Sequence, residues 1–335
     1  MVNESSGWDW SPGKKVIWDT SAELDPAPNW IEEPQPSPDG EKAVAVAVYG
    51  EEGYGLCVNG ECQEARYERI WSPHYSPDGR SVALSTDGSD WFVLVDGEPW
   101  EESFGFLWDI QFSRTGETIA VAVQRDGEYG MVVEGQPWET MYENANNFAL
   151  SPDGSASAAV VQIRNIPQAD IFTFKEGCFS VAVNGEVWEQ SFINAYTPTF
   201  DAAAQRVAAQ VRTTLYDYTI AVNGEVWKST YSCIWEPRFH PVTGAVVAPV
   251  RLKGRWGLAQ DGEVVWNPRF FQLWHQQFSA DGKHLYAIVS PKFGRWTVIC
   301  DDKPWGPTFG EMVTDLVVSP DGQRAAVVAK DQGKY

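Results

Sequence analysis

The stretch Ala182-Val183-Asn184-Gly185-Glu186-Val187-Trp188 decides the fold, because the same seven residues return at Ala221 to Trp227. Looser copies occur at 95–100, 133–138, 261–266 and 300–305, and an early copy at 58–62 lacks the tryptophan. A β-rich run that ends in Asn-Gly or Asp-Gly indicates a type I′ hairpin, whose two turn residues take positive φ. One hairpin unit is therefore repeated along the chain.

A second turn signal precedes each hairpin. It occurs at Ser37-Pro38-Asp39-Gly40, Ser76-Pro77-Asp78-Gly79, Ser113-Arg114-Thr115-Gly116, Ser151-Pro152-Asp153-Gly154, His240-Pro241-Val242-Thr243-Gly244, Ser279-Ala280-Asp281-Gly282 and Ser319-Pro320-Asp321-Gly322, with a degenerate copy at Asp201-Ala202-Ala203-Ala204. Pro, Asp and Gly in this order make a tight turn. A period of about forty residues indicates a repeat architecture.

Each repeat reads as strand A, the Ser-Pro-Asp-Gly turn, strand B, a variable loop, strand C, the Asn-Gly-Glu turn and strand D. Four antiparallel strands in about forty residues form one blade of a β-propeller. We therefore predict an all-β chain, a single β-propeller domain over residues 1–335. Eight blades are expected, with seven as the alternative if the N-terminal stretch is only a cover.

The termini are expected to close the propeller. Residues 1–36 and 314–335 would form one composite blade, with seven continuous blades between them. Lys15 to Asp19 and Ala22 to Ile31 would supply its strands C and D. Such closure removes exposed sheet edges.

Many of the 17 tryptophans recur at two regular positions of the repeat. Trp71, Trp108, Trp235 and Trp274 are expected just before strand A. The structural repeat at strand D is formed by Trp100, Trp138, Trp188, Trp227, Trp266 and Trp305. A large ring that recurs in every blade is expected to fill the wedge between neighbouring blades. A functional aromatic array is the alternative.

The net charge is −21, and all of the excess lies in the first half. Residues 1–160 carry 29 Asp and Glu against 8 Lys and Arg, whereas residues 161–335 carry 17 of each. Such a chain repels phosphate backbones, so we expect no nucleic-acid partner. No apolar run reaches the length of a membrane span, and Met1 to Asp9 show no secretory signal, so we expect a cytoplasmic chain.

No catalytic constellation, metal site or cofactor site is visible in the sequence. The five cysteines, Cys57, Cys62, Cys178, Cys233 and Cys300, are scattered and odd in number, so we expect free thiols in a reducing compartment. The turn aspartates lie one per blade, which turn chemistry explains better than calcium binding. We expect no cofactor bound by this chain.

Function is expected on the loops that join strands B and C and strands D and A, which gather on one face. Blade four carries an insertion there, over residues 163–174, that is rich in apolar side chains. The B–C loops of blades six and seven are basic, and those of blades one to three are acidic, as at Glu51 and Asp126. The predicted partner-binding residues are Arg164, Asn165, Ile166, Pro167, Ile171, Phe172, Phe174, Arg251, Lys253, Arg255, Lys292 and Arg295.

The Ser-Pro-Asp-Gly turns, each followed by an apolar strand, resemble the WD40-like repeats of TolB-type β-propellers over nearly the whole chain. The repeated Asn-Gly-Glu-x-Trp and the many tryptophans of an acidic chain also resemble the tryptophan-rich subunits of Tmc transmembrane electron-transfer complexes of sulfate-reducing bacteria. That resemblance implies an accessory subunit without a cofactor, peripheral on the inner face of the cytoplasmic membrane. Its implied partners are an iron–sulfur subunit related to heterodisulfide reductase and a membrane cytochrome b, which carry the iron–sulfur clusters and haem.

The sequence thus favours a non-catalytic scaffold subunit of a membrane-associated redox complex. One alternative is a propeller hydrolase or lyase, for which His275 beside Trp274 is the visible candidate. The other is a glycan- or peptide-binding propeller, which requires tryptophan side chains exposed on the loop face.

Overall fold

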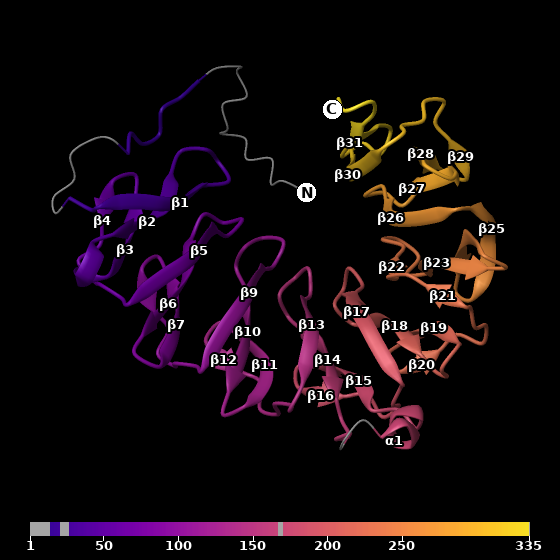
Figure 1. Ribbon diagram of the computed structural model, residues 1–335, viewed down its shortest axis with the longest axis horizontal. Helices are drawn as coiled ribbons and strands as arrows, with labels where there is room; N and C mark the ends of the chain where they lie inside the picture. Colours follow the sequence, from indigo (N-terminus) through magenta and orange to yellow (C-terminus); the bar gives the residue numbers. More distant parts are fainter. Residues whose placement is uncertain (1–13, 21–26, 167–169, 335) are drawn as a thin grey trace. The chain divides into compact units, whose positions relative to one another are not determined.

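The computed structural model describes residues 14–20, 27–166 and 170–334. The chain forms two compact units, residues 1–144 and 145–335, and each is described by itself. Within each unit the antiparallel sheets follow one another in chain order (Figure 1).

Unit 1 contains three four-stranded sheets and one short 3-10 helix, Gly50–Glu52. The strands are β1 (Trp30–Pro36), β2 (Ala43–Val48), β3 (Tyr54–Val58) and β4 (Glu61–Cys62); β5 (Arg69–Tyr75), β6 (Ser81–Asp87), β7 (Asp90–Val95) and β8 (Glu98–Pro99); and β9 (Phe106–Phe112), β10 (Ile119–Arg125), β11 (Glu128–Val133) and β12 (Gln136–Pro137).

Unit 2 contains the remaining five sheets and helix α1 (Ile171–Lys175). The first two sheets consist of β13 (Ala145–Leu150), β14 (Ser157–Gln162), β15 (Phe179–Val183) and β16 (Glu186–Val187), then β17 (Asn194–Phe200), β18 (Val207–Arg212), β19 (Tyr218–Val222) and β20 (Glu225–Val226). The third consists of β21 (Cys233–Ile234), β22 (Arg238–Phe239), β23 (Val246–Leu252), β24 (Arg255–Gln260) and β25 (Glu263–Phe270). The last two consist of β26 (Gln272–Phe278), β27 (Leu285–Lys292), β28 (Arg295–Cys300) and β29 (Lys303–Pro304), then β30 (Met312–Val318) and β31 (Ala325–Lys330).

The predicted fold class, an all-β propeller, is confirmed. Seven sheets pair their strands antiparallel in the order A, B, C, D, and in the third sheet of unit 2 strand A is split into β21 and β22. The last sheet consists of strands A and B alone, β30 and β31. The Ser-Pro-Asp-Gly turns join strands A and B, and the Asn-Gly turns join strands C and D. The described residues form eight sheets, which agrees with the eight predicted blades.

The structure explains why Asn or Asp occupies the first position of these turns. Asn184 and Gly185 both take positive φ, 50° and 83°, as a type I′ hairpin requires. The side chain of Asn184 also accepts a hydrogen bond from the backbone N–H of Ser157, the first residue of strand B, over 2.8 Å. Asn59, Asp96, Asn223, Asp261 and Asp301 make the same bond to their own strand B. A short acceptor side chain therefore ties six C–D turns to strand B, and Glu134 makes the same bond to Ile119 with a longer side chain.

The hydrophobic core lies between successive sheets. In unit 2, Val160 of β14, Val181 of β15 and Val211 of β18 are fully buried in one cluster that joins two sheets. Strand B contributes most because both of its faces are covered, which explains its continuous apolar sequence.

Three strand-D tryptophans, Trp100, Trp188 and Trp227, pack on the turn glycine of the next sheet. A Cβ at Gly224 would lie 3.6 Å from Cβ of Trp188, and one at Gly262 would lie 3.4 Å from that of Trp227. Gly135 contacts Trp100 in the same way. In the early copy without tryptophan, Gln63 takes the equivalent place and donates to the carbonyl oxygen of Asp96 over 3.2 Å.

The sheets are not closed by hydrogen bonds, contrary to the predicted composite blade. β30 and β31 pair only with each other among the described residues. Lys15 to Asp19 form no strand, and Ile31 belongs to β1, where it pairs with Ala47 of β2. The prediction failed because β1 is needed as strand A of the first sheet. Residues 22–26 lie outside the described part.

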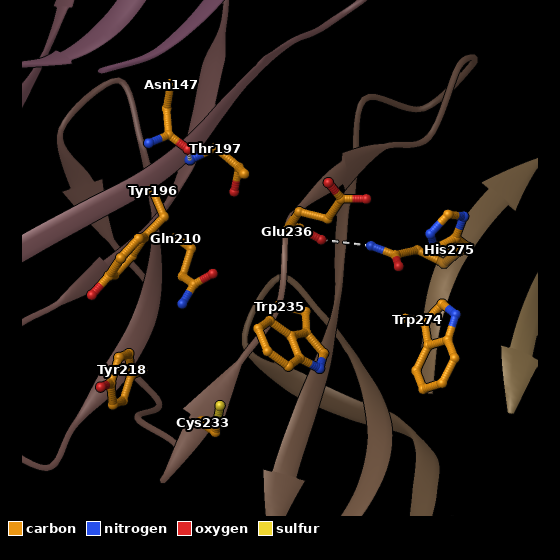
Figure 2. Close-up of a pocket in the computed structure, with 11 residues that line it drawn as sticks. Asn147, Tyr196, Thr197, Gln210, Tyr218, Cys233, Trp235, Glu236, Trp274 and His275 are labelled. Carbon is orange, nitrogen blue, oxygen red and sulfur yellow. Dashed lines mark hydrogen bonds between the residues drawn. The ribbon is translucent and has the colours of Figure 1, made fainter. Parts of the chain in front are cut away.

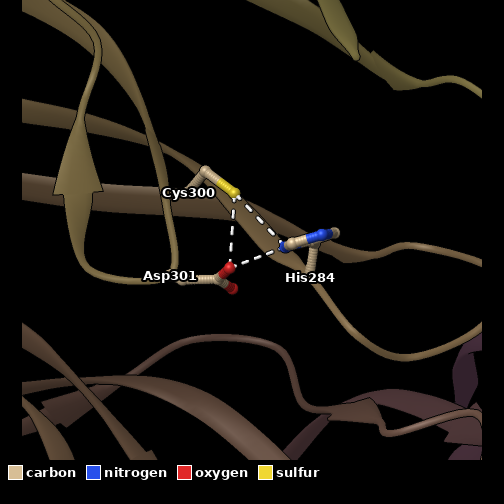
Figure 3. Close-up of side chains that lie close together, drawn as sticks. All are labelled: His284, Cys300 and Asp301. Carbon is tan, nitrogen blue, oxygen red and sulfur yellow. Dashed lines mark hydrogen bonds and ion pairs between the residues drawn. The ribbon is translucent and has the colours of Figure 1, made fainter. Parts of the chain in front are cut away.

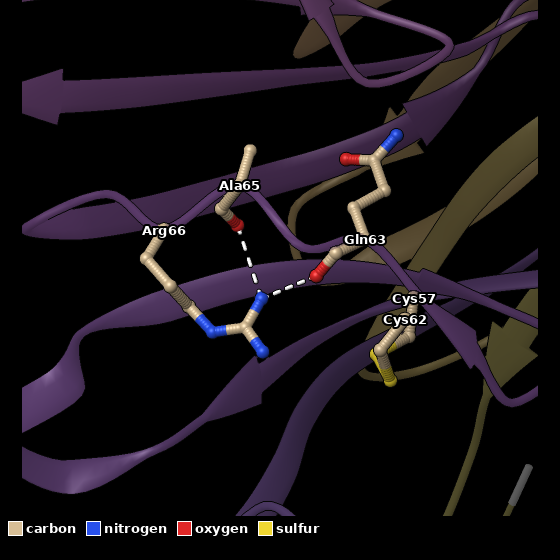
Figure 4. Close-up of a disulfide and its surroundings, with 5 residues drawn as sticks. All are labelled: Cys57, Cys62, Gln63, Ala65 and Arg66. Carbon is tan, nitrogen blue, oxygen red and sulfur yellow. Dashed lines mark hydrogen bonds between the residues drawn. A yellow bond between two sulfur atoms is a disulfide. The ribbon is translucent and has the colours of Figure 1, made fainter. Parts of the chain in front are cut away.

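Cys57 and Cys62 form a disulfide, contrary to the predicted free thiols (Figure 4). The hairpin between β3 and β4 places them directly opposite each other, with a Cα–Cα distance of 4.0 Å. In the sequence this pair straddles the Asn59-Gly60 turn, but the expectation of free thiols gave more weight to the odd number and wide spacing of the cysteines. Cys178, Cys233 and Cys300 are free.

Candidate binding site

Strand A bulges at the same place in seven sheets, and a residue in the left-handed region marks each bulge. These residues are Glu33, Ser72, Asp109, Asn147, Thr197, His275 and Asp315, with φ from 42° to 56°. A bulge re-aims the side chains beside it and recurs next to functional sites. The aromatic residues expected just before strand A instead lie within it, immediately before the bulge, at Trp71, Trp108 and Trp274.

In unit 2 the bulges line a cavity of about 710 Å³. Its lining residues come from the first three strands of neighbouring sheets and are Asn147, Tyr196, Thr197, Gln210, Tyr218, Cys233, Trp235, Glu236, Trp274, His275 and Gln276 (Figure 2). The volume lies in the range of about 300–1,000 Å³ that is typical of small-molecule sites.

Aromatic rings form much of the cavity wall. Trp235 stacks on Trp256 of its own sheet with a centroid distance of 5.4 Å and an angle of 5°, and Trp274 lies 4.5 Å from Trp296. Each ring is thus held on one side by its own sheet. Trp235 remains 42% exposed. Burial raises the pKa of the Tyr196 phenol, which therefore stays protonated and can donate a hydrogen bond.

Two buried glutamines in the cavity depart from the repeat. Gln210 is 8% exposed and pairs across the sheet with Tyr196. The equivalent residues of other sheets are all apolar: Val46, Leu84, Ala122, Val160, Ile288 and Val328. Gln276, 2% exposed, follows the bulge, where other sheets have Pro34, Pro73, Ile110, Phe148, Pro198, Pro237 and Leu316. Sequence analysis missed both, although aligning the repeats residue by residue would have revealed them.

The amide of Gln276 is only half satisfied. Its Nε2 donates to the backbone oxygen of Glu236 over 2.5 Å, but its Oε1 has no hydrogen-bond partner among the described residues. The hydroxyl oxygen of Thr197 also has no hydrogen-bond partner among the described residues. Buried polar groups without a partner cost free energy, so such groups in a cavity point to a ligand or water.

The cavity has little net charge. Glu236 contributes a carboxylate, but its Oε1 accepts from Arg238 Nη2 over 2.9 Å. His275, the candidate of the predicted enzyme, lies at the cavity beside Trp274.

The predicted insertion forms a helix-bearing loop between β14 and β15. Asp170 caps α1 by accepting from the backbone N–H of Phe172 over 2.9 Å. Ile171 and Phe172 are 48% and 75% exposed, and Phe174 is partly buried. Arg164 lies 3.6 Å from the carboxylate of Glu176. Asn165 is exposed and Ile166 partly buried, whereas Pro167 lies outside the described residues.

The predicted basic residues gather on two neighbouring hairpins. Arg251, Lys253 and Arg255 flank the β23–β24 turn, and Lys292 and Arg295 flank the β27–β28 turn. The guanidinium of Arg255 lies 3.7 Å from the ring centre of Phe271, and that ring lies 6.2 Å from Phe293. The B–C and D–A connections therefore meet on one surface here.

Exposed aromatic tips are a feature that the sequence analysis missed. Phe293 is 87% exposed between the two basic residues of its hairpin, and Tyr216 is 80% exposed between β18 and β19. An aromatic residue beside glycine at a hairpin tip, as in Phe293-Gly294, was the available signal. The acidic B–C connections, such as that of Glu51, belong to unit 1, and the basic ones belong to unit 2.

His284, Cys300 and Asp301 bring three potential metal ligands within 4.8 Å (Figure 3). Burial alone would raise the pKa of Asp301, but hydrogen bonds from His284 and Leu285 hold it below its usual value. The set includes the ligand types of zinc. Both carboxylate oxygens are already used, Oδ1 by the Leu285 N–H and Oδ2 by His284, over 2.9 and 2.7 Å. We interpret the cluster as a hydrogen-bonded histidine–aspartate pair beside a thiol.

In the described part of the chain, no helix has the length and apolar character needed to cross a membrane. No protein-family model matches the chain. No curated protein matches it either.

Solved structures show distant similarity. The Dos1 propeller shares 12% identity at a TM-score of 0.43, and 87% of each chain is covered. The open-velcro β-propeller domain of the Trilobed protease from Pyrococcus furiosus shares 11% at 0.38, over 83% of this chain and 96% of that one. TolB from Acinetobacter baumannii shares 17% at 0.33, over 72% of this chain and 61% of TolB. Identities this low concern the fold alone.

Proposed function

We propose that this chain is a non-catalytic docking subunit that binds a protein partner through the B–C and D–A connections of unit 2. A propeller fold by itself supports a protein-interaction or scaffold role and nothing more specific. The observation that carries the proposal is the exposure of Phe172, Tyr216 and Phe293, at 75%, 80% and 87%, in three of the B–C connections of unit 2.

Large apolar side chains at loop tips add nothing to the core of the free chain. Aromatic residues and arginine are the usual anchors of protein interfaces, because they bury a large area at low entropic cost. Arg255, stacked on Phe271 beside Phe293, is such an arrangement. The surrounding basic side chains favour a partner with an acidic surface.

The proposed partner belongs to a membrane-associated electron-transfer complex, in which this chain lies peripheral on the cytoplasmic side. Support comes from the resemblance of the tryptophan-rich Asn-Gly-Glu-x-Trp repeat to the accessory subunits of such complexes. The iron–sulfur subunit related to heterodisulfide reductase and the membrane cytochrome b would then carry the cofactors, and this chain would bind none.

The test is affinity purification of the tagged chain from gently solubilised membranes, with identification of co-purifying proteins and a visible absorption spectrum. Haem and iron–sulfur subunits should co-purify with the wild-type chain and be lost with Phe172→Asp combined with Phe293→Asp. The matched control is Val242→Asp, at a 70% exposed position of an A–B turn. A colourless chain without partners would contradict the proposal.

A second candidate function is ligand binding, and the exposed ring of Trp235 at the cavity favours it. The glycan-binding alternative requires tryptophan side chains exposed on the loop face. Trp235 is 42% exposed, but it lies at the strand-A cavity and not in a B–C or D–A connection.

A further inference from the structure

The cavity of unit 2 differs from the rest of the repeat in chemistry and not only in shape. Two of its positions, Gln210 and Gln276, carry amides where the other sheets carry apolar residues. The other sheets show that the fold itself does not need an amide at either place. Because a buried amide costs stability unless it is hydrogen-bonded, these two residues require an explanation other than folding.

We propose that this cavity binds a neutral saccharide. The amides of Gln210, Gln276 and Asn147 and the hydroxyl of Thr197 offer both donors and acceptors, as a ring of hydroxyl groups does. The Oε1 atom of Gln276, without a partner and almost fully buried, is the acceptor that a sugar hydroxyl would satisfy.

The aromatic groups suit the apolar face of a sugar ring. Trp235 is stacked on Trp256 and Trp274 lies against Trp296, so each has only one face available to a ligand. The negative face of an aromatic ring attracts the C–H bonds of a sugar. One open ring face with amides beside it therefore suits a saccharide, and adenine is included in the experiment below because a nucleobase also stacks on a single ring.

The charges at the cavity disfavour a charged ligand. A quaternary ammonium ion requires an aromatic cage, and an unpaired carboxylate would strengthen its binding. The carboxylate of Glu236 is instead paired with Arg238 over 2.9 Å. The cavity lining contains no Lys or Arg to hold an anion. A cavity with one paired carboxylate and no basic side chain in its lining suits a neutral ligand.

The experiment is saturation-transfer NMR and calorimetry on the full chain with glucose, galactose, mannose, N-acetylglucosamine, cellobiose and maltose, each up to about 10 mM. We expect at least one of them to bind. Gln210→Val and Gln276→Leu introduce residues that other sheets carry at these positions, so both variants should fold, and each should weaken binding about tenfold. Trp235→Ala should weaken it at least as much.

The matched control is Gln323→Leu, an exposed glutamine in an A–B turn, which should leave the affinity unchanged. Urea unfolding of each variant establishes that it is folded. Three outcomes would overturn the proposal: no saccharide of the panel binds, the affinity is the same in the two glutamine variants, or tetramethylammonium or adenine binds while no saccharide does. Each of these is independent of partner capture by the loop face.

Discussion

Gln210 of β18 lies directly opposite Tyr196 of β17, at the register position where six other sheets place an apolar side chain. The pair lies at the wall of the unit 2 cavity. In a repeat protein the same position recurs in a comparable environment, so equivalent residues of different sheets can be compared directly. A polar residue at one copy of a buried apolar position therefore identifies a site more sharply than burial alone.

Gln210→Val should raise the free energy of unfolding by about 1 kcal/mol, because a buried amide is replaced by the apolar residue of the repeat. The reverse change in the neighbouring sheet, Val160→Gln, should lower it by about 3 kcal/mol, since Val160 is fully buried. Urea unfolding measures both. If Gln210→Val also lowered the free energy of unfolding, the two positions would not be equivalent.

Trp266→Ala should lower the free energy of unfolding by about 3–5 kcal/mol. Trp266 is 7% exposed and packs in the cluster of Val247 and Leu258. Trp30→Ala is the control, because that ring is 53% exposed; we expect a loss of about 1 kcal/mol or less. A small loss at Trp266 would mean that the strand-D tryptophans do not stabilise the contact between sheets.

Residues 164–177 should be replaceable by Asp-Gly without loss of stability. Ile163 donates to Cys178 over 2.8 Å, so the two strands already meet at the distance that a two-residue hairpin requires. The expected change in the free energy of unfolding is below about 1 kcal/mol. Partner capture from solubilised membranes should fall sharply in the same variant. If capture persists, the insertion is not part of the docking surface.

Acid should destabilise the chain through its Ser-Pro-Asp-Gly turns. The serine hydroxyl donates to the carboxylate over 2.6 Å at Asp39 and 2.5 Å at Asp321, and holds both pKa values below the usual one. A pKa lowered by folding gives stability that is complete above the unfolded pKa of about 3.9 and is lost as the pH falls through the folded value. The urea midpoint should therefore be flat above about pH 5 and fall below about pH 4.

Ser37→Ala combined with Ser319→Ala should make that fall shallower, because the two carboxylates lose the donor that lowers their pKa. Ser89→Ala, in an exposed turn, should leave the pH profile unchanged. An unchanged profile in the double variant would assign the acid sensitivity to other groups.

Local chemistry determined the blades. The Asn-Gly and Ser-Pro-Asp-Gly turns are specified by a few neighbouring residues. Strand B can be recognised in the sequence as an apolar run, because both of its faces are covered. Their order along the chain therefore predicted the strands, the turns and eight sheets. The repeat also predicted a large ring at each strand D, such as Trp188, although not that it packs on the glycine of the next turn.

Only the tertiary structure decided what the repeats do together. The cavity joins Asn147, Tyr196, Trp235 and Trp274 from four sheets, about forty residues apart along the chain. The role of Gln210 depends on its register against Tyr196, and the disulfide of Cys57 and Cys62 depends on their facing positions across a hairpin. The prediction that the termini form one composite blade was wrong, because β1 pairs with β2 as strand A of the first sheet. Sequence periodicity specifies each unit, but pairing and side-chain exposure depend on atoms that meet only when the units pack.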